Sequence, residues 1–196
     1  SIIENAMMDP NGMVDVDDDR LTENTRASYP LSFLNRVKDG AFCGHPRTII
    51  FLTADAYGVL PPVACLTPEQ AAIWFLMGYT SKLAGTETGV IKPQATFSRF
   101  FGQPFMPRHP NDYISLFRRY ISAYHPSLYL VNTGWSGGPY GTGKRMDIEL
   151  TRTIVRVVSS GALRDAVCDE DARFHFSVPR VIPGVDSRML NPKNVW

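Results

Sequence analysis

The chain has 196 residues, 44% of them hydrophobic, and its 20 basic and 19 acidic residues leave a net charge of +1. That composition suffices for one domain with a sizeable core, and the balanced charge gives no support to a nucleic-acid partner. No apolar run approaches the roughly 20 residues of a membrane span, so no membrane partner is expected, and the three widely spaced cysteines favour a reducing, cytoplasmic location over a disulfide framework.

The first strong signals are a strand and the helix that follows it. Residues 46–54 are a short apolar run rich in β-branched and aromatic side chains, which is typical of a buried strand. Thr67 has the features of a helix N-cap, because Pro68 stands at the first helical position and Gln70 completes a capping box. We expect the apolar side chains of this helix to face the core, and they are Ile73, Trp74, Met77 and, if the helix extends that far, Leu83.

A long irregular segment comes next. Residues 84–97 have neither helical nor strand periodicity and contain two glycines and a proline. A loop of this length inside a compact domain is usually functional or disordered. Regular elements then resume as a helix, a strand and a helix, at 111–124, 127–133 and near 148–159, and the rest is strand and loop.

The glycine-rich segment 134–145 is the richest candidate site, and its letters fit more than one pattern. It has the G-x-x-x-x-G-K spacing of a P-loop, but Arg145 stands where a Ser or Thr must ligate Mg²⁺, and the next helix begins too late. It also contains G-x-S-x-G around Ser136, with Asp169 and His175 as candidate partners. The glycines and proline after Ser136 exclude the helix that a nucleophile elbow requires, so both patterns are disfavoured.

The remaining interpretations of this segment are a backbone-lined nucleotide loop and a plain strand-to-helix turn. Glycines allow a ligand to approach the backbone N–H groups, and Lys144 and Arg145 add positive charge. Arg26 leaves a similar choice between a surface ion pair and a clamp for phosphate or carboxylate. Cys43 and His45 are too sparse for a metal site, so no metal ligand is assigned.

Several longer stretches, taken in order, resemble one family. They are T-E-N-T-R (22–26), F-L-T-A-D-A-Y-G-V-L-P-P (51–62), L-T-P-E-Q (66–70), A-G-T-E (84–87), Y-L-V-N-T-G-W (129–135), G-K-R (143–145) and P-G-V-D (183–186). In these motifs the chain resembles the ATP-dependent phosphoenolpyruvate carboxykinases, and the likeness covers nearly the whole chain. It implies an α/β fold with a mixed β-sheet and flanking helices, in which residues 1–196 are a single partial domain, the carboxy-terminal ATP-binding portion.

The resemblance also implies a reaction and its cofactors. Oxaloacetate and ATP would give phosphoenolpyruvate, carbon dioxide and ADP, a step of gluconeogenesis, with Mg²⁺ on the nucleotide and Mn²⁺ at the substrate. By position, Arg26 resembles the catalytic arginine that contacts the substrate and the terminal phosphate of the nucleotide. Arg145, Met146 and Thr151 resemble the residues around adenine and ribose. Segment 84–97 resembles a mobile lid, with lid residues Ala84, Gly85, Thr86, Glu87 and Gly89.

The chain departs from the family pattern in ways that bear on activity. The family's P-loop, its metal ligands and its carboxylate-binding arginine lie upstream of anything in this sequence, so the remaining carboxykinase segment is an expected partner. Lys92 stands where the family usually has Glu, and Arg99 and Phe100 stand where it has Ala and Cys. Two hypotheses follow: a segment of an active carboxykinase that is inactive alone, or a non-catalytic structural subunit of a larger assembly.

Overall fold

The computed structural model describes residues 2–15, 18, 20–21, 26–35, 37–38, 40, 42–83 and 90–196. The chain divides into two compact units. We call Ser1–His45 with Lys82–Lys92 the small unit, and Pro46–Ser81 with Pro93–Trp196 the main unit. Among the described residues, the hydrophobic core cluster lies wholly in the main unit.

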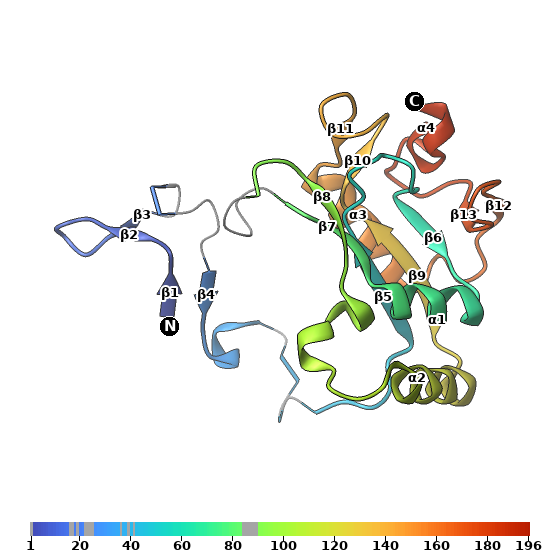
Figure 1. The fold of residues 1–196 in the computed structure, drawn as a ribbon, viewed down its shortest axis with the longest axis horizontal. Helices are drawn as coiled ribbons and strands as arrows, with labels where there is room; N and C mark the ends of the chain where they lie inside the picture. The colour runs from blue at the N-terminus through green and yellow to red at the C-terminus, as the bar shows by residue number, and fades with distance from the viewer. Residues whose placement is uncertain are drawn as a thin grey trace. The chain divides into compact units, whose positions relative to one another are not determined.

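The small unit contains short antiparallel strand pairs. β1 (Ile2–Glu4) pairs with β4 (Arg26–Ser28), and β2 (Met7–Met8) pairs with β3 (Val14–Asp15), as Figure 1 shows. A 3-10 turn follows at Leu31–Phe33. These strands are largely exposed, so their pairing is held by backbone hydrogen bonds rather than by a core.

The main unit is built on a mixed sheet of five strands within the described residues, in the order β12-β13-β6-β9-β5 (Figure 1). β9 and β5 run parallel, whereas β6 and β13 continue the sheet in antiparallel fashion. The strands are β5 (Thr48–Thr53), β6 (Val63–Cys65), β9 (Ser127–Asn132), β12 (Cys168–Glu170) and β13 (Ser177–Pro179). The predicted α/β class and the predicted strands at 46–54 and 127–133 are confirmed.

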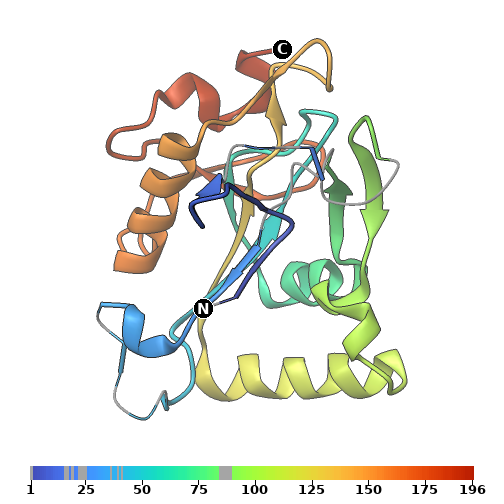
Figure 2. The same cartoon turned by 90° about the vertical axis from the view of Figure 1, so that its left-hand side faces the viewer.

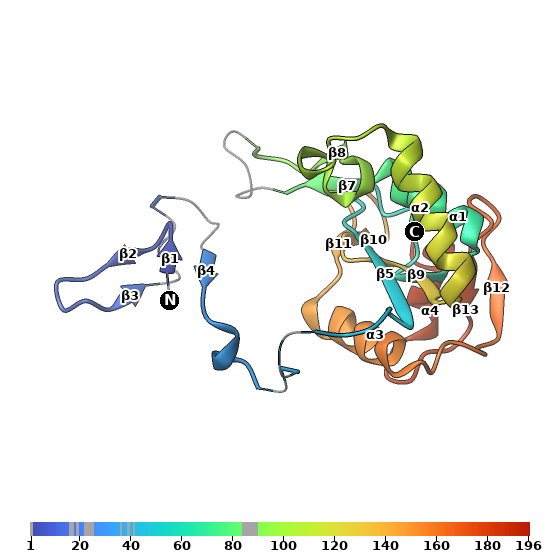
Figure 3. The ribbon, with the colours of Figure 1, turned by 90° about the horizontal axis from the view of Figure 1, so that it is seen from below.

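Helices cover both faces of this sheet. α1 and α2 lie side by side, and α3 lies on the opposite side of β9 from α1 (Figures 2 and 3). The helices are α1 (Pro68–Met77), α2 (Pro110–Tyr124), α3 (Ile148–Ser160) and the short α4 (Ser187–Leu190), and 3-10 turns occur at Arg99–Phe101, Gln103–Phe105 and Pro192–Asn194. The three predicted helices are confirmed, including the capping box, in which the Thr67 hydroxyl accepts from Gln70 N at 3.2 Å and the Gln70 side chain accepts from Thr67 N at 2.9 Å.

The core-facing side of α1 was predicted only in part. Trp74 is buried, but Ile73 is 54% exposed, and the side chain that reaches deepest belongs to Ala71, which is 0% exposed. The helix ends at Gly78, whose left-handed φ of 56° stops it, so Leu83 lies beyond the helix. Ala71, Ala72 and Trp74 are the buried residues of α1, so they form its inner face and Ile73 lies outside it.

The predicted loop 84–97 also needs correction. Residues 84–89, with all the assigned lid residues, lie outside the described part of the chain. Residues 94–97 are not irregular: they form β8 (Gln94–Phe97), which pairs with β7 (Tyr79–Lys82) in a two-stranded sheet. Both strands have only four residues, too few for the polar and apolar alternation of Gln94–Phe97 to stand out in the sequence, so their pairing makes them strands.

An aromatic cluster fills the space between β5 and α2. Phe100 has a left-handed φ of 62° and is 6% exposed. Its ring centroid lies 5.0 Å from that of Phe75 and 4.9 Å from that of Tyr113. Residue 100 thus occupies a packed position, and its large side chain is accommodated by tilted ring contacts.

Candidate nucleotide-binding loop

The carboxyl ends of the parallel strands mark the edge where open α/β sheets usually bind ligands. Thr53 at the end of β5 lies in register with Asn132 at the end of β9. The chain leaving β9 returns across this edge, because Thr133 N donates to Thr53 O at 2.8 Å and Trp135 N donates to Asp55 O at 2.8 Å. The glycine-rich segment therefore begins at the edge that the fold makes available for a ligand.

A buried carboxylate organises the turn after β5. Asp55 is 0% exposed and accepts hydrogen bonds from the backbone N–H groups of Tyr57 (2.9 Å), Val59 (2.7 Å) and Leu60 (2.9 Å). The hydroxyl of Tyr79 also donates to it at 2.9 Å. Burial, and then the charge of Asp55, raise the pKa of Tyr79, so this phenol stays a donor. Four donors compensate the burial of the carboxylate.

Asn132 joins this turn to the glycine-rich segment. Its side-chain oxygen accepts from Asp55 N at 3.0 Å and from Gly134 N at 2.8 Å, and its amide donates to Leu60 O at 3.1 Å. The residue is 1% exposed, so all three bonds are made away from solvent. One amide side chain therefore fixes the start of the loop relative to the turn at Asp55.

The glycine-rich segment forms a hairpin. β10 (Trp135–Ser136) pairs with β11 (Lys144–Arg145), with Trp135 opposite Arg145. α3 begins only at Ile148, after Asp147 caps it by accepting from Leu150 N at 2.7 Å. A strand stands where a P-loop requires a helix, and bends and turns follow Ser136, where a nucleophile elbow requires one, so the geometry is that of neither.

The proposed partners of a nucleophilic serine are engaged elsewhere. Asp169 forms an ion pair with Arg180 at 2.7 Å, and His175 contacts Glu170 at 2.5 Å. All four residues are exposed, and they lie on or beside β12 and β13. No catalytic triad geometry at Ser136 follows from these described contacts.

Several glycines in this region serve contacts between backbone segments. A Cβ on Gly134 would lie 2.3 Å from Asp55 N and O, and one on Gly143 would lie 2.1 Å from Gly138 O. A Cβ on Gly58 would meet Gly138 O at 2.3 Å. Glycines in segment 134–145 left a nucleotide loop and a plain turn both open, and these contacts show that Gly134 and Gly143, with Gly58, allow the hairpin to lie against itself and against the turn after β5.

Two of the predicted nucleotide-binding residues come together at this hairpin. The Arg145 side chain is exposed, its guanidinium carbon lies 5.7 Å from the Trp135 ring centroid, and its Nε lies 3.5 Å from Thr133 O. Met146, next in sequence, is 7% exposed. Both line an open cavity of about 390 Å³, with Ser136, Gly137, Thr142, Gly143, Lys144, Asp147, Met189 and Val195.

The other predicted residues are not brought to this cavity by the described structure. Thr151 is one turn into α3, is not among the lining residues, and donates its hydroxyl to Asp147 O at 3.2 Å. Arg26 is exposed on β4 of the small unit, in register with Glu4, which suits the ion-pair interpretation as well as the clamp. Arg26 and Arg145 thus belong to different units.

The described residues provide no ligand set for a metal. No group of three His, Cys, Asp or Glu side chains among them is arranged to hold an ion. The residues that the structure describes therefore do not fit Mg²⁺ or Mn²⁺. In the described ranges, none of the helices is both long enough and apolar enough to cross a membrane.

Three residues central to this site were missed from the sequence. Asp55 and Asn132 form the buried network, and Trp135 lies against the Arg145 guanidinium. A signal did exist, because Asp55 and Asn132 each stand at the end of an apolar run, where parallel strands present their ligand-binding edge. No local pattern indicates that these two residues bond to each other.

Comparison with known proteins agrees with this class of α/β protein. Residues 1–188 match the family described as phosphoenolpyruvate carboxykinase. The chain is 51% identical to "Phosphoenolpyruvate carboxykinase (ATP)" of Rhizobium rhizogenes over 196 residues, which is 100% of this chain and 37% of the relative. It is 53% identical to "Phosphoenolpyruvate carboxykinase (ATP) 1" of Moorella thermoacetica over 197 residues, 100% of this chain and 38% of the relative.

These matches make the family assignment direct. The fold and the hairpin define an α/β protein with a cationic loop at the carboxyl edge of a mixed sheet. The chain belongs to the ATP-dependent phosphoenolpyruvate carboxykinase family. It spans 37% of the length of the Rhizobium rhizogenes relative.

Proposed function

We propose that this chain is the nucleotide-binding part of a carboxykinase that converts oxaloacetate and ATP into phosphoenolpyruvate, carbon dioxide and ADP. The observation that carries the proposal is the hairpin cavity of about 390 Å³ lined by Arg145 and Met146, in a chain half identical to relatives that carry this name. The reaction belongs to gluconeogenesis, and we place it in the cytoplasm.

In this proposal the hairpin recognises the nucleoside. Arg145 lies along the base or ribose, and its contact with the Trp135 ring (5.7 Å) holds the guanidinium plane for stacking. Met146 N already donates to Gly134 O at 2.8 Å, so a base meets other atoms of Met146. Thr151, in the first turn of α3, is proposed to contact the ribose. This contact requires the ribose to lie beside the start of that helix.

The phosphoryl chemistry depends on groups outside this cavity. Arg26 is proposed to neutralise the charge of the transferred phosphoryl group, which is the main demand of phosphoryl transfer. Segment 84–97 is proposed as the lid that excludes water. The remaining carboxykinase segment is proposed to supply the P-loop and the ligands of Mg²⁺ and Mn²⁺.

The proposal predicts a division of activity between the chain and its complement. The isolated chain should form no phosphoenolpyruvate from oxaloacetate, ATP and Mn²⁺ in a coupled assay. In the complete polypeptide, Arg26→Ala should lower turnover about 1,000-fold with little loss of stability, and Arg26→Lys should recover little, because Lys cannot make a two-pronged contact. Turnover by the isolated chain, or near-normal turnover of Arg26→Ala, would contradict these assignments.

A non-catalytic structural subunit is the second candidate, and one observation favours it. Gly58, Gly134 and Gly143 are explained by backbone contacts alone, so the hairpin would keep its shape without a nucleotide. Calorimetric titration of the complete polypeptide with ATP and ADP separates the candidates. Carboxykinase function requires binding that Arg145→Ala weakens and Arg156→Ala, a change on the exposed face of α3, leaves unchanged. Absence of nucleotide binding in the wild type would favour the structural subunit.

A further inference from the structure

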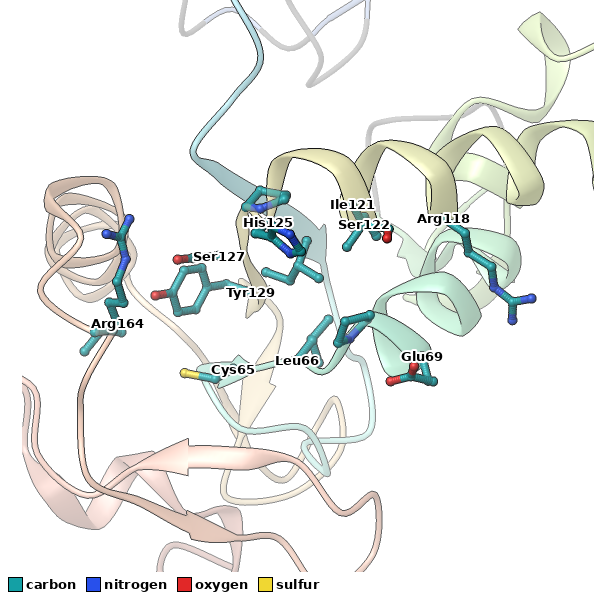
Figure 4. A pocket seen from close by; sticks show the side chains of 14 residues that line it. Cys65, Leu66, Glu69, Arg118, Ile121, Ser122, His125, Ser127, Tyr129 and Arg164 are labelled. Atoms are coloured by element: carbon teal, nitrogen blue, oxygen red, sulfur yellow. The ribbon is translucent and has the colours of Figure 1, made fainter.

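A larger cavity lies at the opposite edge of the sheet, where β9 begins. Its volume is about 840 Å³, within the size range of small-molecule sites. Figure 4 shows its lining side chains, which come from the end of β6, the start of α1, the end of α2, the first residues of β9 and the turn after α3. None of its lining residues is shared with the cavity beside Arg145.

Cationic groups stand at the two ends of this cavity. Arg164 lies at one end and Arg118 at the other, with His125 between them (Figure 4). Both guanidinium groups are exposed, and within the described ranges neither has a carboxylate partner. Glu69 supplies one carboxylate of the lining against these two cations, so the cavity carries a net positive charge.

Hydroxyl groups accompany the arginine at one end. Tyr129 and Ser127 both line the cavity, and they stand two positions apart on β9, so their side chains lie on the same face of the strand. Burial, the largest effect, raises the pKa of Tyr129. The nearby charge of Arg164 lowers that pKa by a smaller amount. A protonated phenol, a serine hydroxyl and a guanidinium group together can donate several hydrogen bonds to one anionic group.

Part of the cavity wall between the two cations is apolar. Its side chains are nearly buried, with exposed fractions of 9%, 5%, 5% and 3% for Leu66, Ile121, Leu128 and Leu163. A fully ionic ligand would gain nothing from this surface, whereas a hydrocarbon body would be removed from water on it.

We propose that this cavity binds a small organic dianion, with one anionic group at each end of an apolar body. One carboxylate or phosphate group accepts two hydrogen bonds from the Arg164 guanidinium. It also accepts hydrogen bonds from the hydroxyls of Tyr129 and Ser127. The other group pairs with Arg118, and the body of the ligand lies on the leucine and isoleucine side chains. The proposal does not depend on nucleotide binding at Arg145, because the two cavities share no residue.

Linear dicarboxylates from succinate to suberate, titrated by calorimetry into the complete native polypeptide, test this proposal. Because the arginines are held on separate elements, affinity should peak at one chain length, and hexanoate, with one carboxylate, should bind at least about 10-fold more weakly than the best dicarboxylate. Arg118→Met and Arg164→Met keep an apolar stem, and each should reduce the preference for the dicarboxylate over hexanoate by about 10-fold. The matched control Arg156→Met, on the exposed face of α3 and away from the cavity, should change neither affinity.

A second measurement needs no variant. Titration of the wild-type protein with adipate, followed by NMR, should shift the resonances of His125 and Tyr129 and leave those of Met146 unmoved. Three results would overturn the proposal: no dicarboxylate binding, binding without preference for chain length, or equal losses in Arg156→Met and the two cavity variants. Shifts at Met146 alone would also overturn it, since the ligand would then occupy the hairpin cavity.

Discussion

The two edges of the sheet use polar groups in opposite ways. At the carboxyl edge, Asp55 and Asn132 are buried and their hydrogen bonds are made inside the protein. At the opposite edge, where β9 begins and which we call the amino edge, Arg118 and Arg164 are exposed. Neither has a carboxylate partner in the described part of the chain. The first arrangement fixes backbone geometry, whereas the second leaves charge available to a ligand. Mutations at the two edges should therefore have different consequences.

The largest expected loss of stability is at Asn132. Asn132→Ala removes three hydrogen bonds and leaves Asp55 N, Gly134 N and Leu60 O without their partner in a buried site. We expect a loss of about 3 kcal/mol in the free energy of unfolding, measured by urea denaturation. Asn111→Ala, at the exposed start of α2, is the control and should change stability by less than about 0.5 kcal/mol. Equal effects of the two changes would show that the network does not stabilise this edge.

This network also marks the limit of what the sequence predicts. The strands at 48–53 and 127–132 and the three longer helices are visible from apolar runs, caps and prolines, because these signals are local. The bond between Asp55 and Asn132 joins residues 77 positions apart, and no local pattern specifies it. β7 and β8 were missed for a related reason, since strands of only four residues depend on their pairing.

The candidate site likewise has a part that the sequence predicts and a part that it does not. The resemblance to carboxykinases identified Arg145 and Met146, and the fold brings them to one cavity. It could not show that the nearby glycines have a packing role, because that depends on how closely two backbone segments approach. The amino-edge cavity was not predicted, since its residues come from several separate elements and match no motif.

The second largest effect is expected at Gly134. Gly134→Ala places a Cβ 2.3 Å from the Asp55 backbone, so one of the two segments must move. We expect a loss of about 1–3 kcal/mol, and a change in Trp135 fluorescence as the hairpin shifts. Gly44→Ala is the matched control, because its Cβ would meet nothing within 4 Å and its φ is not in the left-handed region. A stable Gly134→Ala protein with unchanged fluorescence would show that the close approach is not required.

A pH-dependent effect is expected at Cys65, which lines the amino-edge cavity. Burial, and then the neighbouring Cys168, raise the pKa of Cys65 well above its ordinary value of 9.0. A thiol with a raised pKa in the folded state stabilises the fold fully below pH 9, and this contribution is lost as the pH rises beyond it, because the unfolded chain deprotonates first. The midpoint of urea denaturation should fall between pH 8 and pH 10.5. It should fall less for Cys65→Ser than for the wild type. Cys43→Ser, at an exposed thiol, should follow the wild type, and parallel falls in all three proteins would contradict the prediction.

The smallest effect on stability should come from the double change Arg118→Met with Arg164→Met. Neither guanidinium group has a carboxylate partner among the described residues, and both side chains are exposed, so their removal breaks no described ion pair. We expect the free energy of unfolding to change by less than about 0.5 kcal/mol, in contrast to the loss at Asn132. A loss of about 2 kcal/mol or more would mean that the arginines stabilise the fold. The amino edge would then resemble the carboxyl edge, and the contrast between a structural edge and a ligand-binding edge would fail.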